Sequence, residues 1–151
     1  MSKSPTKSGE THGHCLCGAV EYAFSGKPLW VAHCHCESCR RATSAAFATY
    51  VGVKLEQFNY LKGEPTFYES SKGAKRYFCQ TCGSPLAFVG DRWQGEIHLY
   101  AGSLVEPQAI EPKGHMNAAE QLPWADLHDD LPRFETFSKG GAAPVRKGPK
   151  R

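Results

Sequence analysis

The sequence contains no apolar run that approaches the roughly 20 residues of a membrane-spanning helix. Residues 1–11 also lack the apolar stretch of a secretory signal, so we expect a cytoplasmic protein that does not engage a membrane. No internal repeat and no long amphipathic helix pattern is present. A chain of 151 residues without these features suits one domain around one core.

Several enzyme motifs are missing as well. Neither a phosphate-binding P-loop nor the glycine fingerprint of dinucleotide-binding folds occurs. Ser84 and Ser103 have no accompanying histidine and aspartate pattern of the kind that activates a serine nucleophile. These absences argue against nucleotide-dependent enzymes and against serine hydrolases.

The formal net charge of +3 arises from the two ends of the chain. Residues 139–151 contain five Lys or Arg and no acid, whereas residues 12–138 contain 11 Lys or Arg against 14 Asp or Glu. We therefore expect a flexible N-terminal tail over residues 1–11, one domain over residues 12–138 and a flexible basic C-terminal tail over residues 139–151. The domain has no basic stripe interleaved with aromatic side chains, so nucleic acid is not expected as a partner.

Short segments of alternating apolar and polar residues predict β-strands. Val20, Tyr22 and Phe24 alternate with Glu21 and Ala23, which is typical of a strand with one buried face. The other strand candidates are residues 29–33, 47–53, 55–60, 66–69, 75–78, 85–89 and 97–101, and residues 38–43 suit a single helical turn. Many short strands separated by glycine and proline predict an all-β domain.

Seven cysteines are an unusual number for a short cytosolic chain. Cytosolic thiols stay reduced and an odd number cannot pair completely, so metal binding is favoured over a disulfide framework. The cysteines form three groups: Cys15 and Cys17; Cys34, Cys36 and Cys39; Cys79 and Cys82.

The first and third groups together suit a closed zinc site. Cys15-x-Cys17 and Cys79-x-x-Cys82 are both followed by glycine, which permits a tight turn with backbone N–H groups directed at a sulfur. On a strand, Cys15 and Cys17 would also present both sulfurs on one face. Four thiolates make a closed tetrahedral zinc site of the structural type, and the alternative is four buried cysteines without metal.

The middle group leaves one coordination position open. Three thiolates are the ligand number of a catalytic zinc, whose fourth position takes water or substrate. The alternatives are a second structural zinc completed by a histidine, or no second metal. On a strand, His33 and His35 would point away from the neighbouring cysteines, so neither is an easy fourth ligand. The remote candidates for a fourth ligand are His98 and His115.

The segments that contain the cysteines form a recognisable set. They read HCLCGAVEY at 14–22, HCHCESCRR at 33–41 and FCQTCGSPL at 78–86, and LPW…DDLPRF follows at 122–134. In sequence and spacing they resemble the glutathione-dependent formaldehyde-activating enzyme family, which includes the centromere-protein-V-like proteins. The resemblance covers residues 13–134 and implies the family's β-tent fold, an all-β zinc-binding scaffold.

The resemblance also implies two zinc ions per chain. A structural zinc maps to Cys15, Cys17, Cys79 and Cys82, and a catalytic zinc maps to Cys34, Cys36 and Cys39. The family activity is carbon–sulfur lyase chemistry, in which S-(hydroxymethyl)glutathione is interconverted with glutathione and formaldehyde. A small thiol and a small aldehyde are therefore the expected partners, with glutathione as the possible cosubstrate.

Other side chains are candidates for contacts with these substrates. The candidates for protonating a developing alkoxide are His35, His98 and His115. Arg40 and Arg41 directly follow the last cysteine of the middle group and can bind the carboxylate of a cosubstrate. Residues 116–121 depart from the family pattern, because they lack the aromatic residue and the arginine that members often carry before Leu-Pro-Trp.

Two further functions stay open at this point. The protein can be a non-catalytic, zinc-stabilised binding module, or a carrier of a thiol or an aldehyde on the same scaffold. Hydrolysis by zinc-bound hydroxide is disfavoured, since three thiolates leave the zinc a poor Lewis acid. The sequence indicates neither the oligomeric state nor the physiological aldehyde and thiol.

Overall fold

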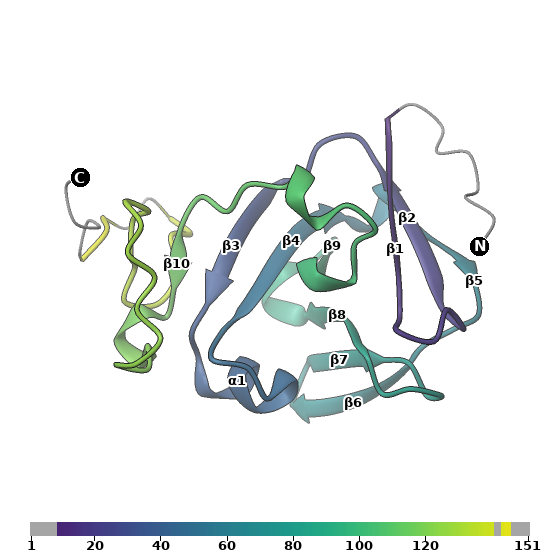
Figure 1. Ribbon diagram of the computed structural model, residues 1–151, viewed down its shortest axis with the longest axis horizontal. Helices are drawn as coiled ribbons and strands as arrows, with labels where there is room; N and C mark the ends of the chain where they lie inside the picture. The colour runs from purple at the N-terminus through teal and green to yellow at the C-terminus, as the bar shows by residue number, and fades with distance from the viewer. Residues whose placement is uncertain (1–8, 141–142, 146–151) are drawn as a thin grey trace. The chain divides into compact units, whose positions relative to one another are not determined.

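The computed structural model describes residues 9–140 and 143–145 (Figure 1). These residues form ten β-strands, one α-helix and five short 3-10 helices. The chain divides into two compact units. Unit 1 comprises Met1–Leu29 and Val51–Ile110, and unit 2 comprises Trp30–Tyr50 and Glu111–Arg151.

Unit 1 consists of antiparallel β-structure. Its three-stranded sheet has the order β1-β2-β5 and is formed by β1 (Glu10–His14), β2 (Glu21–Ser25) and β5 (Phe58–Lys62). A second set of strands has the order β9-β8-β7-β6 and is formed by β6 (Thr66–Ser71), β7 (Ala74–Phe78), β8 (Pro85–Gly90) and β9 (Glu96–Tyr100). The strand β4 (Ala48–Lys54) contributes its last four residues to unit 1 and its first three to unit 2.

The core of unit 1 includes the residues that the alternation in β2 singles out. Tyr22 and Phe24 are buried, and the Tyr22 hydroxyl bonds the Ser103 hydroxyl at 2.6 Å. Ser103 in turn donates to the carbonyl oxygen of Tyr100, so its role is to support the core. Ala23 is also buried, and β2 is therefore less one-sided than its alternating pattern predicts.

Unit 2 places a late segment of the chain beside the HCHC sequence. It contains β3 (Trp30–Cys34), α1 (Glu37–Thr43) and the two-residue strand β10 (His115–Met116). β10 runs parallel to β3, with His115 opposite His33 and Met116 opposite Cys34. The pairing is continued by a 3.0 Å bond from the backbone N–H of His35 to the carbonyl oxygen of Met116. Residues that follow β10 are thus brought close to the middle cysteine group.

The predicted all-β class is confirmed. Most of the regular secondary structure in the described residues is β-strand, α1 is the one α-helix among them, and neither sheet closes into a barrel. One strand prediction is wrong in part, because Leu55–Gln57 form a 3-10 turn before β5. The side-chain oxygen of Gln57 accepts a 3.0 Å bond from the backbone N–H of Lys54 and so stabilises this turn.

Two strands were not predicted. β1 has the sequence ETHGH without a large apolar side chain, yet it pairs along its whole length with β2, from Glu10 opposite Ser25 to His14 opposite Glu21. β10 has only two residues, which is too short for any periodicity. Both strands exist because a partner strand supplies the hydrogen bonds, a contribution that a local pattern does not contain.

The two ends of the chain are described only in part. β1 begins at Glu10, inside the segment predicted as the N-terminal tail. Residues 1–8, 141–142 and 146–151, which hold most of the predicted tails, lie outside the described residues.

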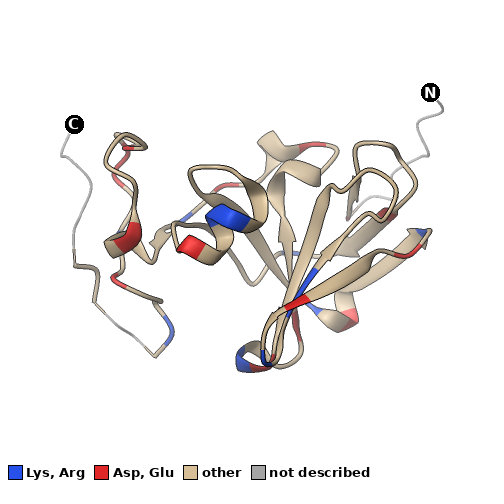
Figure 2. Cartoon of the chain, turned by 90° about the horizontal axis from the view of Figure 1, so that it is seen from below, with Lys and Arg blue, Asp and Glu red and all other residues tan. Residues whose placement is uncertain are grey.

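No helix among the described residues is long and apolar enough to cross a membrane. In the view of Figure 2, Lys and Arg occupy separate short segments among acidic and uncharged ones. A cytoplasmic location and the lack of a nucleic-acid partner stay predictions.

We expect Gly63→Ala to destabilise unit 1 markedly. Gly63 lies between β5 and β6 with φ +61°, and a Cβ atom there would collide with the carbonyl oxygen of Ala19. Left-handed strain alone costs about 1–3 kcal/mol, and the collision with backbone adds to it. Gly95 has φ +79° and open space where a methyl group would lie, so Gly95→Ala is the matched control for strain without collision. In urea unfolding, Gly63→Ala should lower the free energy of unfolding more than Gly95→Ala does. An equal decrease in both variants would contradict the collision.

Candidate metal centres

Unit 1 brings together the first and third cysteine groups. The sulfurs of Cys15, Cys17, Cys79 and Cys82 all lie within 4.8 Å of one another. The Cys15 and Cys17 sulfurs are 3.6 Å apart, and those of Cys17 and Cys79 are 3.8 Å apart. A tetrahedral zinc with Zn–S bonds of about 2.3 Å separates its sulfurs by about 3.8 Å. The four-cysteine centre therefore fits a zinc ion.

Two similar turns hold the four-cysteine centre. Gly18 N–H donates to the Cys15 carbonyl oxygen at 3.1 Å and Gly83 N–H to the Cys79 carbonyl oxygen at 2.8 Å, and both glycines have positive φ. Cys15 and Cys17 do not lie on a strand, because β1 ends at His14 and the chain turns at once, so the turn rather than strand alternation brings their sulfurs together. The predicted donation to sulfur is present, since the Val20 N–H contacts the Cys15 sulfur at 3.3 Å.

Ser84 supports the same centre. Its hydroxyl oxygen lies 3.2 Å from the Cys82 sulfur and accepts a 3.0 Å bond from the backbone N–H of Leu16. Hydrogen bonds from the hydroxyl and the backbone of Ser84 lower the pKa of the Cys82 thiol to about 5. A thiol that ionises this readily suits a site built from thiolates.

Unit 2 brings together the middle group at the start of α1. Cys34 ends β3, Cys36 is the N-cap of α1 and Cys39 lies within that helix, and their sulfurs are within 4.8 Å of one another. The Cys36 sulfur accepts the backbone N–H of Cys39 at 3.3 Å. Hydrogen bonds with Cys36 and Cys39, followed by burial, raise the pKa of the Cys34 thiol. Thiolates this close together repel one another, and a cation bound among the sulfurs would remove that repulsion.

None of the candidate histidines joins the three-cysteine centre among the described residues. His33 and His115 instead form a separate group with Asp129. His98 lies in unit 1, where its Nε2 bonds the Glu96 carboxylate at 2.9 Å. Among the described residues, three cysteines are thus the metal-ligating side chains that converge here.

The two candidate arginines differ in their surroundings. The Nε atom of Arg40 donates to the His35 carbonyl oxygen at 3.3 Å, which ties the arginine to the backbone of the HCHC sequence. Arg41 is 78% exposed and forms a 2.8 Å ion pair with Glu37 one helical turn earlier. Neither guanidinium forms a hydrogen bond to a cysteine sulfur among the described residues.

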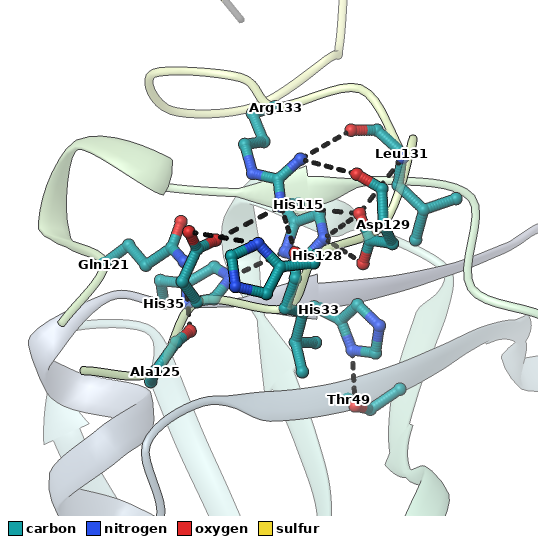
Figure 3. A network of polar contacts seen from close by, with 12 residues as sticks. His33, His35, Thr49, His115, Gln121, Ala125, His128, Asp129, Leu131 and Arg133 are labelled. Carbon is teal, nitrogen blue, oxygen red and sulfur yellow. Dashed lines mark hydrogen bonds and ion pairs between the residues drawn. The ribbon is translucent and has the colours of Figure 1, made fainter. Parts of the chain in front are cut away.

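A buried polar chain runs from His35 to Arg133 (Figure 3). His35 Nε2 and His115 Nδ1 are 2.7 Å apart, and His115 Nε2 lies 2.9 Å and 3.1 Å from the two oxygens of Asp129. An Arg133 guanidinium nitrogen lies 3.4 Å from Asp129. His35, His115 and Arg133 are each at most 1% exposed. Sequence reasoning missed Asp129 and Arg133, although both belong to the DDLPRF segment that it singled out.

The chain of contacts determines which nitrogen of His35 carries the proton. Burial opposes ionisation of Asp129, yet hydrogen bonds from His115 and the Leu131 N–H keep its pKa below the ordinary value. An ionised Asp129 accepts from His115 Nε2, and in a neutral His115 ring Nδ1 is then the acceptor for a proton on His35 Nε2. The remaining His35 Nδ1 then has a free lone pair, and it is buried without a hydrogen-bond partner among the described residues. Burial, with a smaller contribution from His115, lowers the pKa of His35 to about 4 and keeps the ring neutral.

A pocket of about 510 Å³ lies in the C-terminal part of unit 2. Its lining includes Ala118, Gln121, Asp126, Arg133 and Glu135. Ala118 directly follows Asn117, whose side-chain amide contacts the Cys34 sulfur at 3.3 Å. The rest of the lining is apolar and includes Leu122, Pro123 and Val145, so a few polar side chains stand in a largely apolar pocket.

Comparisons with known proteins show what this chain is similar to. The chain is 32% identical over 80 residues to a protein of Schizosaccharomyces pombe described as an uncharacterized lyase, and the match covers 53% of this chain and 58% of that protein. It therefore spans less than two thirds of this relative's length. A crystal structure of a Rhodobacter sphaeroides protein is similar, with a TM-score of 0.54 and 26% identity over 67% of this chain and 91% of the other. The sequence profile of the glutathione-dependent formaldehyde-activating enzymes matches residues 10–120, including all seven cysteines, and the chain belongs to that family.

Proposed function

We propose that this protein is a zinc-dependent carbon–sulfur lyase that adds glutathione or a similar thiol to formaldehyde or another small aldehyde, and reverses that addition. The observation that carries the proposal is the convergence of three sulfurs in unit 2 without a fourth protein ligand among the described residues. Membership of the family and the lyase description of the Schizosaccharomyces pombe relative support it. Two zinc ions per chain are part of the proposal, one in each cysteine centre.

The two centres have different roles in this proposal. Cys15, Cys17, Cys79 and Cys82 would hold a structural ion, because four thiolates are the ligand set of a closed zinc site. Cys34, Cys36 and Cys39 would hold the second ion, which would favour the ionised form of a thiol that binds beside them. The protein's own residues would then have to orient the aldehyde and to accept or donate one proton.

His35 is the residue that we assign to the proton. In the lyase direction the hydroxyl proton of the hemithioacetal leaves, the C=O double bond forms, the C–S bond breaks and the sulfur departs with its electron pair. The lone pair on His35 Nδ1 suits acceptance of that proton, and the sulfur regains a proton as the free thiol. In the synthetic direction the same nitrogen returns its proton to the alkoxide. His115 has both ring nitrogens engaged, so its proposed role is to position His35.

Arg40 and the pocket in unit 2 are the proposed contacts for the rest of the thiol. Arg40 borders the cysteine centre through its bond to the His35 backbone, and a guanidinium can receive a carboxylate such as those of glutathione. Arg41 is a weaker contributor to this role, since Glu37 already pairs with it. The lack of an arginine in residues 116–121 leaves fewer cations for an anionic thiol than family members often have.

The proposal is tested by comparing catalysed and uncatalysed rates. Thiols add to formaldehyde without a catalyst, so hemithioacetal formation is followed at a protein concentration far below that of the thiol. A lyase should exceed the uncatalysed rate through many turnovers, with glutathione and small uncharged thiols compared in parallel. A carrier would instead bind one equivalent and leave the later rate unchanged. The uncatalysed rate with every thiol tested would overturn the lyase assignment.

Replacing His35 with glutamine should lower turnover by about 10²–10⁴-fold, which is the usual contribution of a general acid–base group. Glutamine fills much of the same space but does not exchange a proton near neutral pH. Zinc content should stay at the wild-type value, measured by elemental analysis. His128→Gln is the matched control in unit 2, because His128 is 80% exposed and contacts Asp126 at 3.7 Å. Equal turnover in the His35 and His128 variants would remove His35 from the mechanism.

A further inference from the structure

Asn117 makes a polar contact with the three-cysteine centre. The sequence alone does not predict this contact. Its side-chain Nδ2 donates to the Cys34 sulfur at 3.3 Å, and both residues are buried, each 8% exposed. We propose that Asn117 is a positioning residue of this centre, whose amide sets the electron density that the Cys34 sulfur offers to a metal. The inference rests on the proposed zinc at Cys34, Cys36 and Cys39.

The contact completes a pattern around the three sulfurs. Cys36 accepts the backbone N–H of Cys39 at 3.3 Å, and the Cys39 sulfur lies 3.3 Å from the Tyr50 hydroxyl. With Asn117 beside Cys34, each sulfur has a polar neighbour of its own. Three thiolates around a divalent cation carry a net negative charge, and donors placed at the sulfurs reduce the cost of burying it.

The backbone of Asn117 is held in an uncommon conformation that directs the side chain. Its φ of 52° and ψ of 42° are left-handed, and Ser44 is the one other non-glycine residue with positive φ in the described part of the chain. Asparagine tolerates this region better than most residues, although left-handed backbone still costs free energy. A 2.7 Å bond from Asn117 N–H to the Thr136 carbonyl oxygen holds the turn.

The register of β10 explains why this turn meets Cys34. Met116 lies opposite Cys34 in the parallel pair with β3, so Asn117 is the first residue past the end of that pairing. In its left-handed conformation Asn117 is the N-cap of the 3-10 helix Ala118–Glu120, which follows directly. Glu120 then accepts the backbone N–H of Glu37 at 3.2 Å, which joins the same segment to the start of α1. Asn117 is therefore anchored between the strand and the helix that carry the three cysteines.

An amide donor should make the centre hold its metal more tightly. It donates to the Cys34 sulfur and so offsets part of the negative charge that three thiolates would gather in a buried site. Contacts of this kind typically change metal affinity by about 10–100-fold. The donor also withdraws electron density from sulfur, which raises the energy of sulfur-to-metal charge transfer.

The test uses the full-length protein with Asn117→Gly and Asn117→Asp. Glycine keeps the left-handed backbone and removes the amide, whereas aspartate keeps the size and replaces the donor with an acceptor. Ser44→Gly is the matched control, because it relieves the same backbone conformation at the end of α1. Competition with a colorimetric zinc chelator measures the affinity for each zinc, and cobalt substitution reports the sulfur-to-metal charge-transfer band.

We expect both Asn117 variants to release the more weakly held zinc about 10-fold more readily or more, with the other zinc unaffected. Their cobalt charge-transfer bands should shift to lower energy, and Ser44→Gly should match wild type in both measurements. Wild-type affinity and an unshifted band in both Asn117 variants would overturn the role of Asn117 alone. A wild-type protein that binds only one zinc would overturn both this inference and the proposed catalytic centre.

Discussion

Protein carrying Cys36→Ser should bind one zinc per chain where wild type binds two, and its hemithioacetal chemistry should fall to the uncatalysed rate. A serine hydroxyl is a poor zinc ligand at neutral pH compared with a thiolate, so the three-cysteine centre loses a third of its ligands. Serine is also one of the preferred N-cap residues, and it can accept the Cys39 N–H that the Cys36 sulfur accepts now. The helix α1 should therefore persist while the metal is lost.

This design separates chemistry from folding. Elemental analysis gives the zinc content, circular dichroism checks the fold, and the rate assay is the one that tests the lyase assignment. Arg41→Ala measures how much an exposed charge on the same helix contributes to turnover. We expect this substitution to change turnover only slightly. If Cys36→Ser retained two zinc ions and full turnover, the assignment of a catalytic metal to Cys34, Cys36 and Cys39 would fail.

Cys79→Ser should unfold the protein rather than only inactivate it. Cys79 is 1% exposed and its sulfur is part of the centre that joins residues 15–17 to residues 79–82. Loss of a structural zinc is expected to cost several kcal/mol, on the order of 5 kcal/mol or more. Single domains are stable by only about 5–15 kcal/mol, so a loss of this size removes much or all of the folded population.

Urea unfolding and zinc content together check this prediction. The turn at Cys79 is held by backbone hydrogen bonds to Ser84 and Gly83, and a serine at position 79 preserves them. A decrease in the free energy of unfolding therefore reports the loss of the metal. Ser84→Ala provides a graded comparison, because it removes the hydroxyl beside the Cys82 sulfur but no ligand, at a cost of about 1 kcal/mol. Wild-type stability in Cys79→Ser would show that the four-cysteine centre holds no structural ion.

The division of the cysteines into four and three could be read from the chain because the relevant information is local. Glycine after Cys17 and after Cys82 allows the positive φ that both turns adopt, and the short spacing brings paired sulfurs together. The strand pattern around Tyr22 and Phe24 is local in the same way, since alternation reports burial directly. For Cys15 and Cys17, the turn before Gly18 brings the sulfurs together, and β1 ends before them at His14.

The surroundings of the three-cysteine centre could not be read in that way. Asn117, Asp129 and Arg133 lie more than 75 residues from the HCHC sequence and have no periodicity or spacing in common with it. They reach it through the two-residue strand β10, whose pairing with β3 depends on backbone hydrogen bonds that any residues can make. His35 and His115 were both identified as candidates, but neither the hydrogen bond between them nor the link from His115 to Asp129 was predicted.

The sequence by itself therefore determined the all-β class, the family and which cysteines stand together, because strand alternation, turn glycines and short ligand spacings are properties of neighbouring residues. Only the tertiary structure decided what surrounds the sulfurs. It left the histidines outside the three-cysteine centre, linked His35 through His115 to Asp129, and placed the Asn117 amide against Cys34. The physical reason is that hydrogen bonds between distant residues depend on strand pairing and burial, and these exist only once the chain has folded.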